Sequence, residues 1–312
     1  MKHYLGIDLG GTNIAVGVVD EEARLLRKMS APTPKNVPCG QLAEAIADLC
    51  RRLMEDMALS AEEVAGVGLG SPGQIDMDNG VIVFAGNLGL RNAPIVEELS
   101  KRLGMHTVVL NDADAAAYGE VAAGAARGAA SAVTITLGTG VGCGVVLPGG
   151  VIRPGEGGHM VIVYDGEPCT CGRKGCFEAY ASATALIRQT KIAMVKAPQS
   201  RLWEICGGEL ENVTGKTLFD ALALGDATAK EVFDAYVHYV ACGITNIVNL
   251  VQPEMVCVGG GISGAGEVLL APLRKLVQAD QFPMGDGRVT RIEVCQLGND
   301  AGIIGAALFA RR

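Results

Sequence analysis

The sequence has no excess of basic residues, no long uninterrupted apolar run and no recognisable export signal. Among its 312 residues, 26 lysines and arginines stand against 34 aspartates and glutamates, which gives a formal net charge of −8. This balance argues against a nucleic-acid partner, which would need a basic face. A membrane span would need about 18 consecutive apolar residues, and the sequence offers no such run. Because Asp8 interrupts the first apolar stretch, we expect no secretory signal and a cytoplasmic protein.

The ten cysteines are not arranged as in a small secreted disulfide scaffold, because the chain is long and most of them stand singly in apolar segments. We interpret Cys143, Cys242, Cys257 and Cys295 as small buried hydrophobic residues. Glycine, in contrast, is frequent at 43 residues, and many glycines follow apolar β-branched segments. Glycines in such places allow sharp turns close to a ligand, which predicts loops built around a small anion.

Segments with strand spacing alternate with segments of helical spacing, which predicts an α/β fold of about two domains. Strand patterns at 4–8 and 14–19 enclose a glycine turn, and the same order returns at 132–136, 137–140 and 141–147. We interpret this recurrence as an internal duplication. A loop is expected where the chain carries Asn79, Gly80 and Asn87. Further helices are expected at 41–57, 95–103, 113–126, 183–195, 217–224, 227–251 and 300–310, and further strands at 64–69, 107–110, 255–258 and 291–296.

Both duplicated strand pairs turn on glycine and threonine. Successive backbone N–H groups in such turns form a concave site for an anion, so the pair predicts a phosphate clamp. Asp8, which precedes the first turn, is placed to orient a hydrated cation. Each turn taken alone is also compatible with an ordinary glycine hairpin. The residues expected to contact the phosphates are Gly10, Gly11, Thr12, Asn13, Gly138, Thr139 and Gly140.

Four side chains that bind metals lie close together in the sequence: His159, Cys169, Cys171 and Cys176. With glycines to bend the chain between them, a Cys₃His set suits a closed tetrahedral zinc site. The alternative is a group of thiols without a metal. It is disfavoured because the segment 165–174 is too polar and too rich in turn residues to bury free cysteines. We therefore predict structural zinc.

Several motifs together resemble the ROK family of sugar kinases and repressors. They are Asp8-x-Gly-Gly-Thr, Asn111-Asp112, Gly138-Thr-Gly, Glu156-x-Gly-His159, Cys169-x-Cys-Gly-x-x-Gly-Cys176-x-Glu178 and Val258-Gly-Gly-Gly. The resemblance covers essentially the whole chain, and the loop at Asn87 and the stretch 297–302 look most similar to the glucokinase branch. It implies an α/β, actin-like ATPase (ribonuclease H-like) fold with two domains around a cleft. The expected domains are 1–115 completed by a helix at 298–312, and a larger one at 116–297 that carries the zinc.

The resemblance also implies roles for single residues. Asp112 would be the catalytic base toward a sugar hydroxyl, although Asn-Asp after a strand is more often a turn or a helix cap. Glu178, on its own, also fits a solvated helix residue. The residues implied to bind the sugar are Asn87, Asn111, Asp112, Glu156, His159 and Glu178. Those implied to face the adenine and ribose are Gly259, Gly260 and Gly261.

The implied function is that of a kinase that transfers phosphate from ATP to the 6-hydroxyl of a hexose, with glucose first. Its cofactors would be ATP, Mg²⁺ and structural Zn²⁺, and fructose, mannose, allose and N-acetylmannosamine stay open as acceptors. A sugar-sensing repressor would carry an added N-terminal DNA-binding domain, for which we expect no room before the first strand. A chaperone or filament protein of the same fold would have no use for the zinc and the polar sugar set. Because family members usually self-associate, we expect a homodimer.

Overall fold

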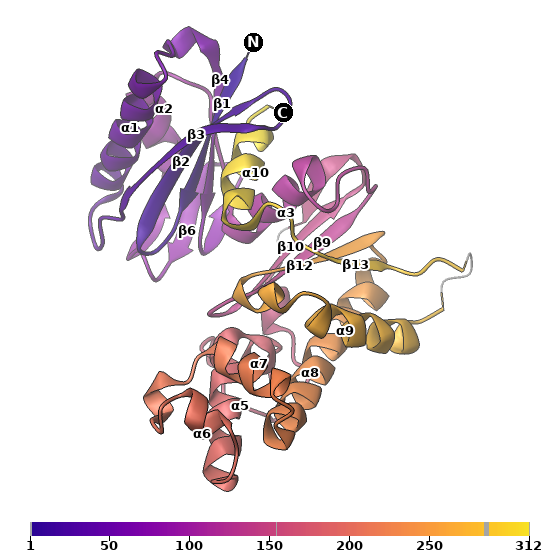
Figure 1. Cartoon of the computed structure of the whole chain (residues 1–312). Coiled ribbons are helices and arrows are strands. Elements are labelled where there is room, and N and C mark those ends of the chain that lie inside the picture. Colours follow the sequence, from indigo (N-terminus) through magenta and orange to yellow (C-terminus); the bar gives the residue numbers. More distant parts are fainter. Residues whose placement is uncertain (1, 154, 284–286, 312) are drawn as a thin grey trace. The chain divides into compact units, whose positions relative to one another are not determined.

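The computed structural model describes residues 2–153, 155–283 and 287–311 and divides into two compact units (Figure 1). The first unit contains residues 1–132, 144–154 and 296–312, and the second contains 133–143 and 155–295. Helix α3 (Asp112–Ala123) lies wholly in the first unit. The boundaries expected from the sequence assigned most of α3 and all of 144–154 to the larger domain, whereas both lie in the first unit here. Helix α3 belongs to the first unit because it packs against the C-terminal helix.

The first unit is built on a mixed five-stranded sheet with the order β3-β2-β1-β4-β8. β1 pairs antiparallel with β2 and parallel with β4, and β4 pairs parallel with β8. The strands are β1 (His3–Leu9), β2 (Asn13–Asp20), β3 (Leu25–Pro32), β4 (Val64–Ser71) and β8 (Thr107–Asn111). Besides α3, the helices are α1 (Cys39–Asp56), α2 (Ile95–Leu103) and α10 (Ala301–Phe309).

Strand β1 shows how the sequence assigns the two faces of this sheet. Leu5 and Ile7 point to one side, where they share a core cluster with Leu42 of α1. Tyr4 points to the other side and packs with Ile304 of α10, as the two-residue repeat of a strand requires. Helices α1 and α2 cover the first face, and α10 and α3 cover the second (Figure 1).

Helix α10 lies directly on the backbone of the sheet, because glycines occupy the strand positions beneath it. A Cβ at Gly68 would lie 1.8 Å from the carbonyl oxygen of Ala306, so no larger residue fits unless the helix moves. The same close packing brings the first turn of α10 over Asp8. The carboxyl carbon of Asp8 lies 3.4 Å from where a Cβ of Gly302 would be.

A second five-stranded sheet has the order β11-β10-β9-β12-β13. Its strands are β9 (Ala132–Leu137), β10 (Val141–Leu147), β11 (Val151–Arg153), β12 (Met255–Gly259) and β13 (Arg291–Val294). The order repeats that of the first sheet, with each glycine turn between the first two strands of its half, as the expected duplication requires. The helices of the second unit are α4 (Glu178–Ala181), α5 (Ala183–Lys196), α6 (Leu202–Ile205), α7 (Gly215–Ala223), α8 (Ala227–Val251) and α9 (Glu267–Asp280).

Two expectations from the sequence are wrong. The segment expected as a loop forms a three-stranded sheet of β5 (Gln74–Asp76), β6 (Val81–Ala85) and β7 (Leu90–Ala93). These strands are too short to show a periodic pattern, and Asn79-Gly80 and Asn87 lie in the turns that join them. Cys242 is exposed on the solvent face of α8, whereas Cys143 and Cys257 are buried and Cys295 is half-buried. None of the helices within the described residues combines the length and apolar character needed to span a bilayer.

Candidate functional site

Three parallel strands of the first unit end side by side. Asp8 of β1 is aligned with Gly70 of β4, and Ser71 of β4 is aligned with Asn111 of β8. Asp112 follows directly as the first residue of α3. The carboxyl ends of parallel strands form the usual ligand-binding edge of an α/β sheet. The two acids expected to act on the cation and on the sugar therefore share one edge.

Burial raises the pKa of both acids. The pKa of Asp8 rises to about 6, first through burial and then through the charge of Asp112. Burial also raises the pKa of Asp112, although the N–H of Ala113 donates to its Oδ1 at 2.9 Å and acts in the opposite direction. A raised pKa brings a carboxylate closer to the value that suits a general base at neutral pH.

The Gly10–Asn13 turn is tied at three points. The N–H of Gly10 donates to the carbonyl of Asn13 at 2.9 Å, which closes the turn. Thr33, the residue directly after β3, donates its hydroxyl to the carbonyl of Gly10 at 2.7 Å and its N–H to that of Thr12 at 2.8 Å. Nothing in the sequence marks Thr33, because its partners lie on a turn about twenty residues away. With these carbonyls engaged, the turn is fixed in shape.

Asn87 lies against the same turn. A Cβ at Gly11 would lie 3.0 Å from the side-chain nitrogen of Asn87, so the two residues are in contact. The next residue, Leu88, is 2% exposed and anchors the loop in the core. The structure thus brings one residue expected to bind sugar next to one expected to bind phosphate.

Asn111 is the N-cap of α3, as the alternative interpretation of Asn-Asp allowed. Its side-chain oxygen accepts the N–H of Ala113 at 2.8 Å, and its side-chain nitrogen donates to the carbonyl of Gly73 at 3.0 Å. These two bonds fix the start of the helix, and with it the direction of Asp112. Each atom of the amide keeps capacity for one further hydrogen bond.

In the second unit the Gly138–Gly140 turn is closed by the N–H of Gly138, which donates to the carbonyl of Gly140 at 3.0 Å. The start of α5 holds the turn from outside, because Thr184 donates its hydroxyl to the carbonyl of Thr139 at 2.8 Å. Gly260 has φ +84°, and a Cβ there would lie 2.4 Å from the carbonyl oxygen of Leu137. The Gly259–Gly261 segment therefore packs against the base of the turn.

The four expected metal ligands meet in the second unit. Their donor atoms, from His159, Cys169, Cys171 and Cys176, all lie within 4.8 Å of one another. The Sγ atom of Cys169 is 3.6 Å from Nδ1 of His159, and those of Cys171 and Cys176 are 3.7 Å apart. Ligands about 2.3 Å from a tetrahedral zinc ion lie about 3.8 Å from one another, so the cluster fits zinc.

Glycine shapes the metal loop. Gly175 has φ +77°, and a Cβ there would lie 1.7 Å from the carbonyl oxygen of Val163, so no other residue fits. Gly172, with φ +86°, makes the other bend between the cysteines. The chain from 164 to 174 contains no buried residue, as expected for a segment ordered by metal ligation and not by a core.

Glu178 lies beside both the metal loop and the glycine turn. Its Oε1 atom accepts the hydroxyl of Thr170 at 2.9 Å, and its Oε2 atom accepts the N–H of Val141 at 3.0 Å. Because both oxygens are engaged, Glu178 is not the solvated helix residue of the alternative interpretation. Glu156 is exposed and lies just before His159, whose N–H donates to its carbonyl at 2.9 Å.

The expected residues thus gather as one set in each unit. In the first unit the set joins the two acids, the first glycine turn, Asn87 and Asn111. In the second it joins the second glycine turn, the 259–261 segment, Glu178 and the metal cluster. Thr33 and Thr170 belong to these sets by contact, and the sequence indicated neither.

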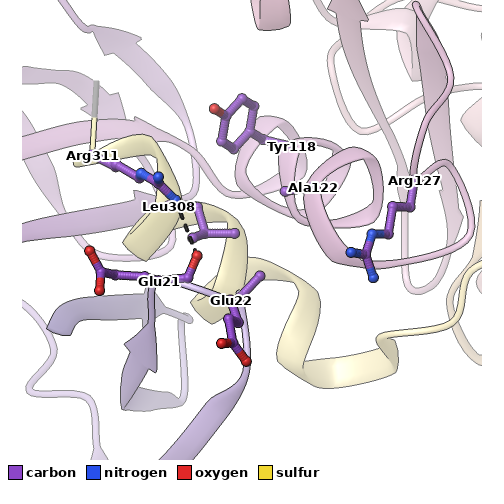
Figure 2. Close-up of a pocket in the computed structure, with 8 residues that line it drawn as sticks. Glu21, Glu22, Tyr118, Ala122, Arg127, Leu308 and Arg311 are labelled. Carbon is purple, nitrogen blue, oxygen red and sulfur yellow. Dashed lines mark hydrogen bonds between the residues drawn. The ribbon is translucent and has the colours of Figure 1, made fainter. Parts of the chain in front are cut away.

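A separate pocket of about 470 Å³ opens in the first unit (Figure 2). Arg311 of the C-terminal end donates to the carbonyl of Glu21 at 3.1 Å, and Leu308 and Tyr118 line its wall. None of the residues expected to bind phosphate, sugar or metal lines this pocket, so it is not part of the candidate site.

The chain is similar to proteins of the ROK family over its full length. The profile of the ROK family matches residues 4–312. The chain is 38% identical to a glucokinase of Thermotoga maritima, over 97% of this chain and 95% of that protein. It is 35% identical to a glucokinase of Halalkalibacterium halodurans, over 100% of this chain and 96% of that protein. The crystal structure of a ROK glucokinase from Streptomyces griseus with glucose and AMPPNP matches with TM-score 0.81, 34% identity and 99% of both chains.

The cluster predicts one bound zinc ion per chain. Replacing Cys171 by Ser removes one thiolate from the tetrahedral set, so zinc content should fall well below one and the melting temperature should drop with it. Elemental analysis and thermal unfolding measure the two effects. Cys242→Ser, at an exposed cysteine outside the cluster, should change neither. Full zinc content in the Cys171 variant would refute the assignment.

Asp8 predicts a dependence of stability on pH. Because folding raises its pKa from 3.8 to about 6, the folded chain binds more protons than the unfolded chain between these values. The contribution of this group to stability is therefore greatest below pH 3.8 and declines as pH rises through about 6. Asp8→Asn should stabilise the protein by up to about 3 kcal/mol near pH 7 and by little near pH 4.

Urea unfolding without nucleotide or Mg²⁺ measures this difference. The exposed Asp78→Asn serves as the control and should show the same small change at both pH values. An Asp8→Asn effect that is equal at the two pH values would contradict the prediction.

Proposed function

This chain belongs to the ROK family, and from that premise we propose that it is a kinase that transfers the γ-phosphoryl group of ATP to the 6-hydroxyl of glucose. The observation that carries the proposal is the position of Asp112. It stands at the ligand-binding edge of the first sheet, beside Asp8, and Asp8 lies two residues before the closed Gly10–Asn13 turn. A general base, a cation-orienting group and a turn of backbone N–H groups are parts that phosphoryl transfer needs.

Similarity supports the two substrates. The most similar relatives described above are named glucokinases, and the matched Streptomyces griseus structure contains glucose and an ATP analogue. Full-length coverage of each chain means that the similarity includes both units. We carry the activity to this chain on these grounds together with the site geometry.

In the proposed mechanism Asp112 orients the 6-hydroxyl and accepts its proton as the oxygen forms its bond to phosphorus. Its raised pKa suits that task, and the Ala113 N–H keeps the carboxylate in one direction. The N–H groups of the two glycine turns stabilise the negative charge on the phosphates. Mg²⁺ held with ATP near Asp8 would neutralise part of this charge, and its presence would favour the ionised form of Asp8.

The sugar is selected by paired polar groups. Amide, imidazole and carboxylate groups can hydrogen-bond to sugar hydroxyls, so an epimer would leave one such group of the protein unpaired. In this chain these groups belong to Asn87, Glu156, His159 and Glu178. A zinc ion with four protein ligands would have no open coordination position for substrate. Its role would be to order the segment from His159 to Cys176, which precedes Glu178. A homodimer and a cytoplasmic location stay predictions from the sequence.

An acceptor panel tests the function. With ATP and Mg²⁺, glucose should give the highest kcat/KM, and mannose, allose, fructose and N-acetylmannosamine should each fall by about tenfold or more, because each would leave one of the proposed sugar-binding groups unpaired. Coupled assays of ADP release measure the rates. A higher value for another sugar reassigns the acceptor, while sugar binding without turnover would favour a sugar-sensing regulator over a kinase.

Removal of the proposed base gives a second test. Asp112→Asn should lower kcat by about 10²–10⁴, the usual contribution of a general base, because an amide cannot accept the hydroxyl proton. Calorimetry should find glucose binding within a few-fold of the wild type, since the amide keeps one acceptor and the shape of the side chain. Asp220→Asn, at a half-buried residue of α7 that pairs with Lys216, is the control. Turnover close to that of the wild type would disprove the base assignment.

A further inference from the structure

The carboxylate of Glu178 connects two parts of the second unit that have separate expected tasks. One oxygen accepts the hydroxyl of Thr170, which lies between two of the metal-cluster cysteines. The other accepts the N–H of Val141, the residue that directly follows the Gly138–Gly140 turn. The two oxygens of one carboxylate are therefore hydrogen-bonded to the loop that carries the cysteines and to the residue that follows the Gly138–Gly140 turn.

The glycine turn leaves space for this carboxylate at one position only. A Cβ at Gly140 would lie 2.3 Å from Oε2 of Glu178, which is closer than any real Cβ contact. A Cβ at Gly138 would meet no described atom within 4 Å. Neither glycine has a positive φ, so backbone conformation does not demand glycine at either place. A side chain at Gly140 is therefore compatible with the fold only if the carboxylate of Glu178 moves from this position, whereas a methyl group at Gly138 meets no such conflict.

We propose that Gly140 and Thr170 are positioning residues for the sugar, and that they act by fixing the carboxylate of Glu178. This inference rests on the proposed function, in which Glu178 binds a sugar hydroxyl. Thr170 sets the direction of one oxygen, and the space at Gly140 admits the other to the N–H of Val141. The metal loop and the phosphate turn thereby share control of one sugar-binding group.

The hydrogen-bonding capacity of a carboxylate permits this role. Its two oxygens offer about four acceptor sites; Thr170 and Val141 occupy two of them, and the Sγ atom of Cys169 lies 3.7 Å from Oε1. The carboxylate keeps acceptor capacity for a sugar hydroxyl, in a direction already set before the sugar arrives. A group fixed in advance loses less conformational freedom on binding, so its bond to the substrate is stronger.

Paired glycine variants test the role of Gly140. Gly140→Ala should push the carboxylate aside and raise the KM for glucose by about tenfold, the usual effect of a weakened hydrogen bond to a charged group. Its KM for ATP should change much less. Gly138→Ala, in the same turn, adds the same methyl group in open space. Any effect of that variant should fall on ATP, with the KM for glucose unchanged.

Thr170 supplies a second test that does not depend on the fold of the turn. Thr170→Val keeps the shape of the side chain but removes the hydroxyl, so the KM for glucose should rise while zinc content stays at the wild-type value. Thr170→Ser restores the hydroxyl and should restore the KM. A purely structural role for Thr170 would instead lower stability or zinc content and leave the KM of the folded fraction unchanged.

The outcomes separate this inference from the proposed function. If the wild type phosphorylates glucose and both Gly140→Ala and Thr170→Val keep its KM for glucose, the positioning role is wrong and the kinase assignment stands. If Gly138→Ala raises the KM for glucose as much as Gly140→Ala does, the contact with Glu178 is not the cause. A wild-type chain that neither binds nor phosphorylates a sugar overturns both proposals.

Discussion

Close contact at glycine is the physical constraint on which the rest of this structure depends. In the first unit, helix α10 lies directly on the sheet because Gly6 and Gly68 have no side chains, and the same close packing brings its first turn over Asp8. In the second, the missing side chain of Gly260 lets the 259–261 segment pack against the strand that leads into the Gly138 turn. Interiors are packed so tightly that one added methyl group at such a point must displace backbone. The geometry of the candidate site therefore depends on glycines that allow close packing as well as on the functional side chains.

Close contact at glycine also brings residues proposed to bind phosphate next to residues proposed to bind the sugar. Gly11 lies against Asn87 and Gly140 lies against Glu178. In each unit, a glycine that is proposed to bind phosphate is thus next to a polar residue that is proposed to bind the sugar. A phosphoryl-transfer enzyme works chiefly by positioning and electrostatic stabilisation, with little covalent chemistry of its own. In the proposed mechanism, direct contact between these glycines and polar side chains would supply this positioning without any intermediate element.

Residues whose role follows from their own chemistry could be predicted from the sequence. The four metal ligands meet as expected, because cysteine and histidine at close spacing around glycines have few other uses. Strands and helices with long apolar repeats were also predictable, and α2 and α8 begin and end where the sequence indicates. Residues whose role comes from a distant partner could not be predicted. Thr33 and Thr170 act through bonds to other segments, and the strands β5 to β7 are too short for a periodic signal.

A zinc ion in the cluster would explain how the polar segment 164–174 is ordered. Residues 164–174 bury no side chain, so hydrophobic packing cannot offset the entropy of ordering them. Zinc ligation would contribute folding free energy directly, and it would act at Cys169 and Cys171 within this segment and at Cys176 just after it. Thr170 lies inside the ordered stretch and Glu178 lies just beyond it. Order imposed by the metal would therefore reach the Glu178 carboxylate through the hydrogen bond of Thr170, and the glycine turn through that of Val141.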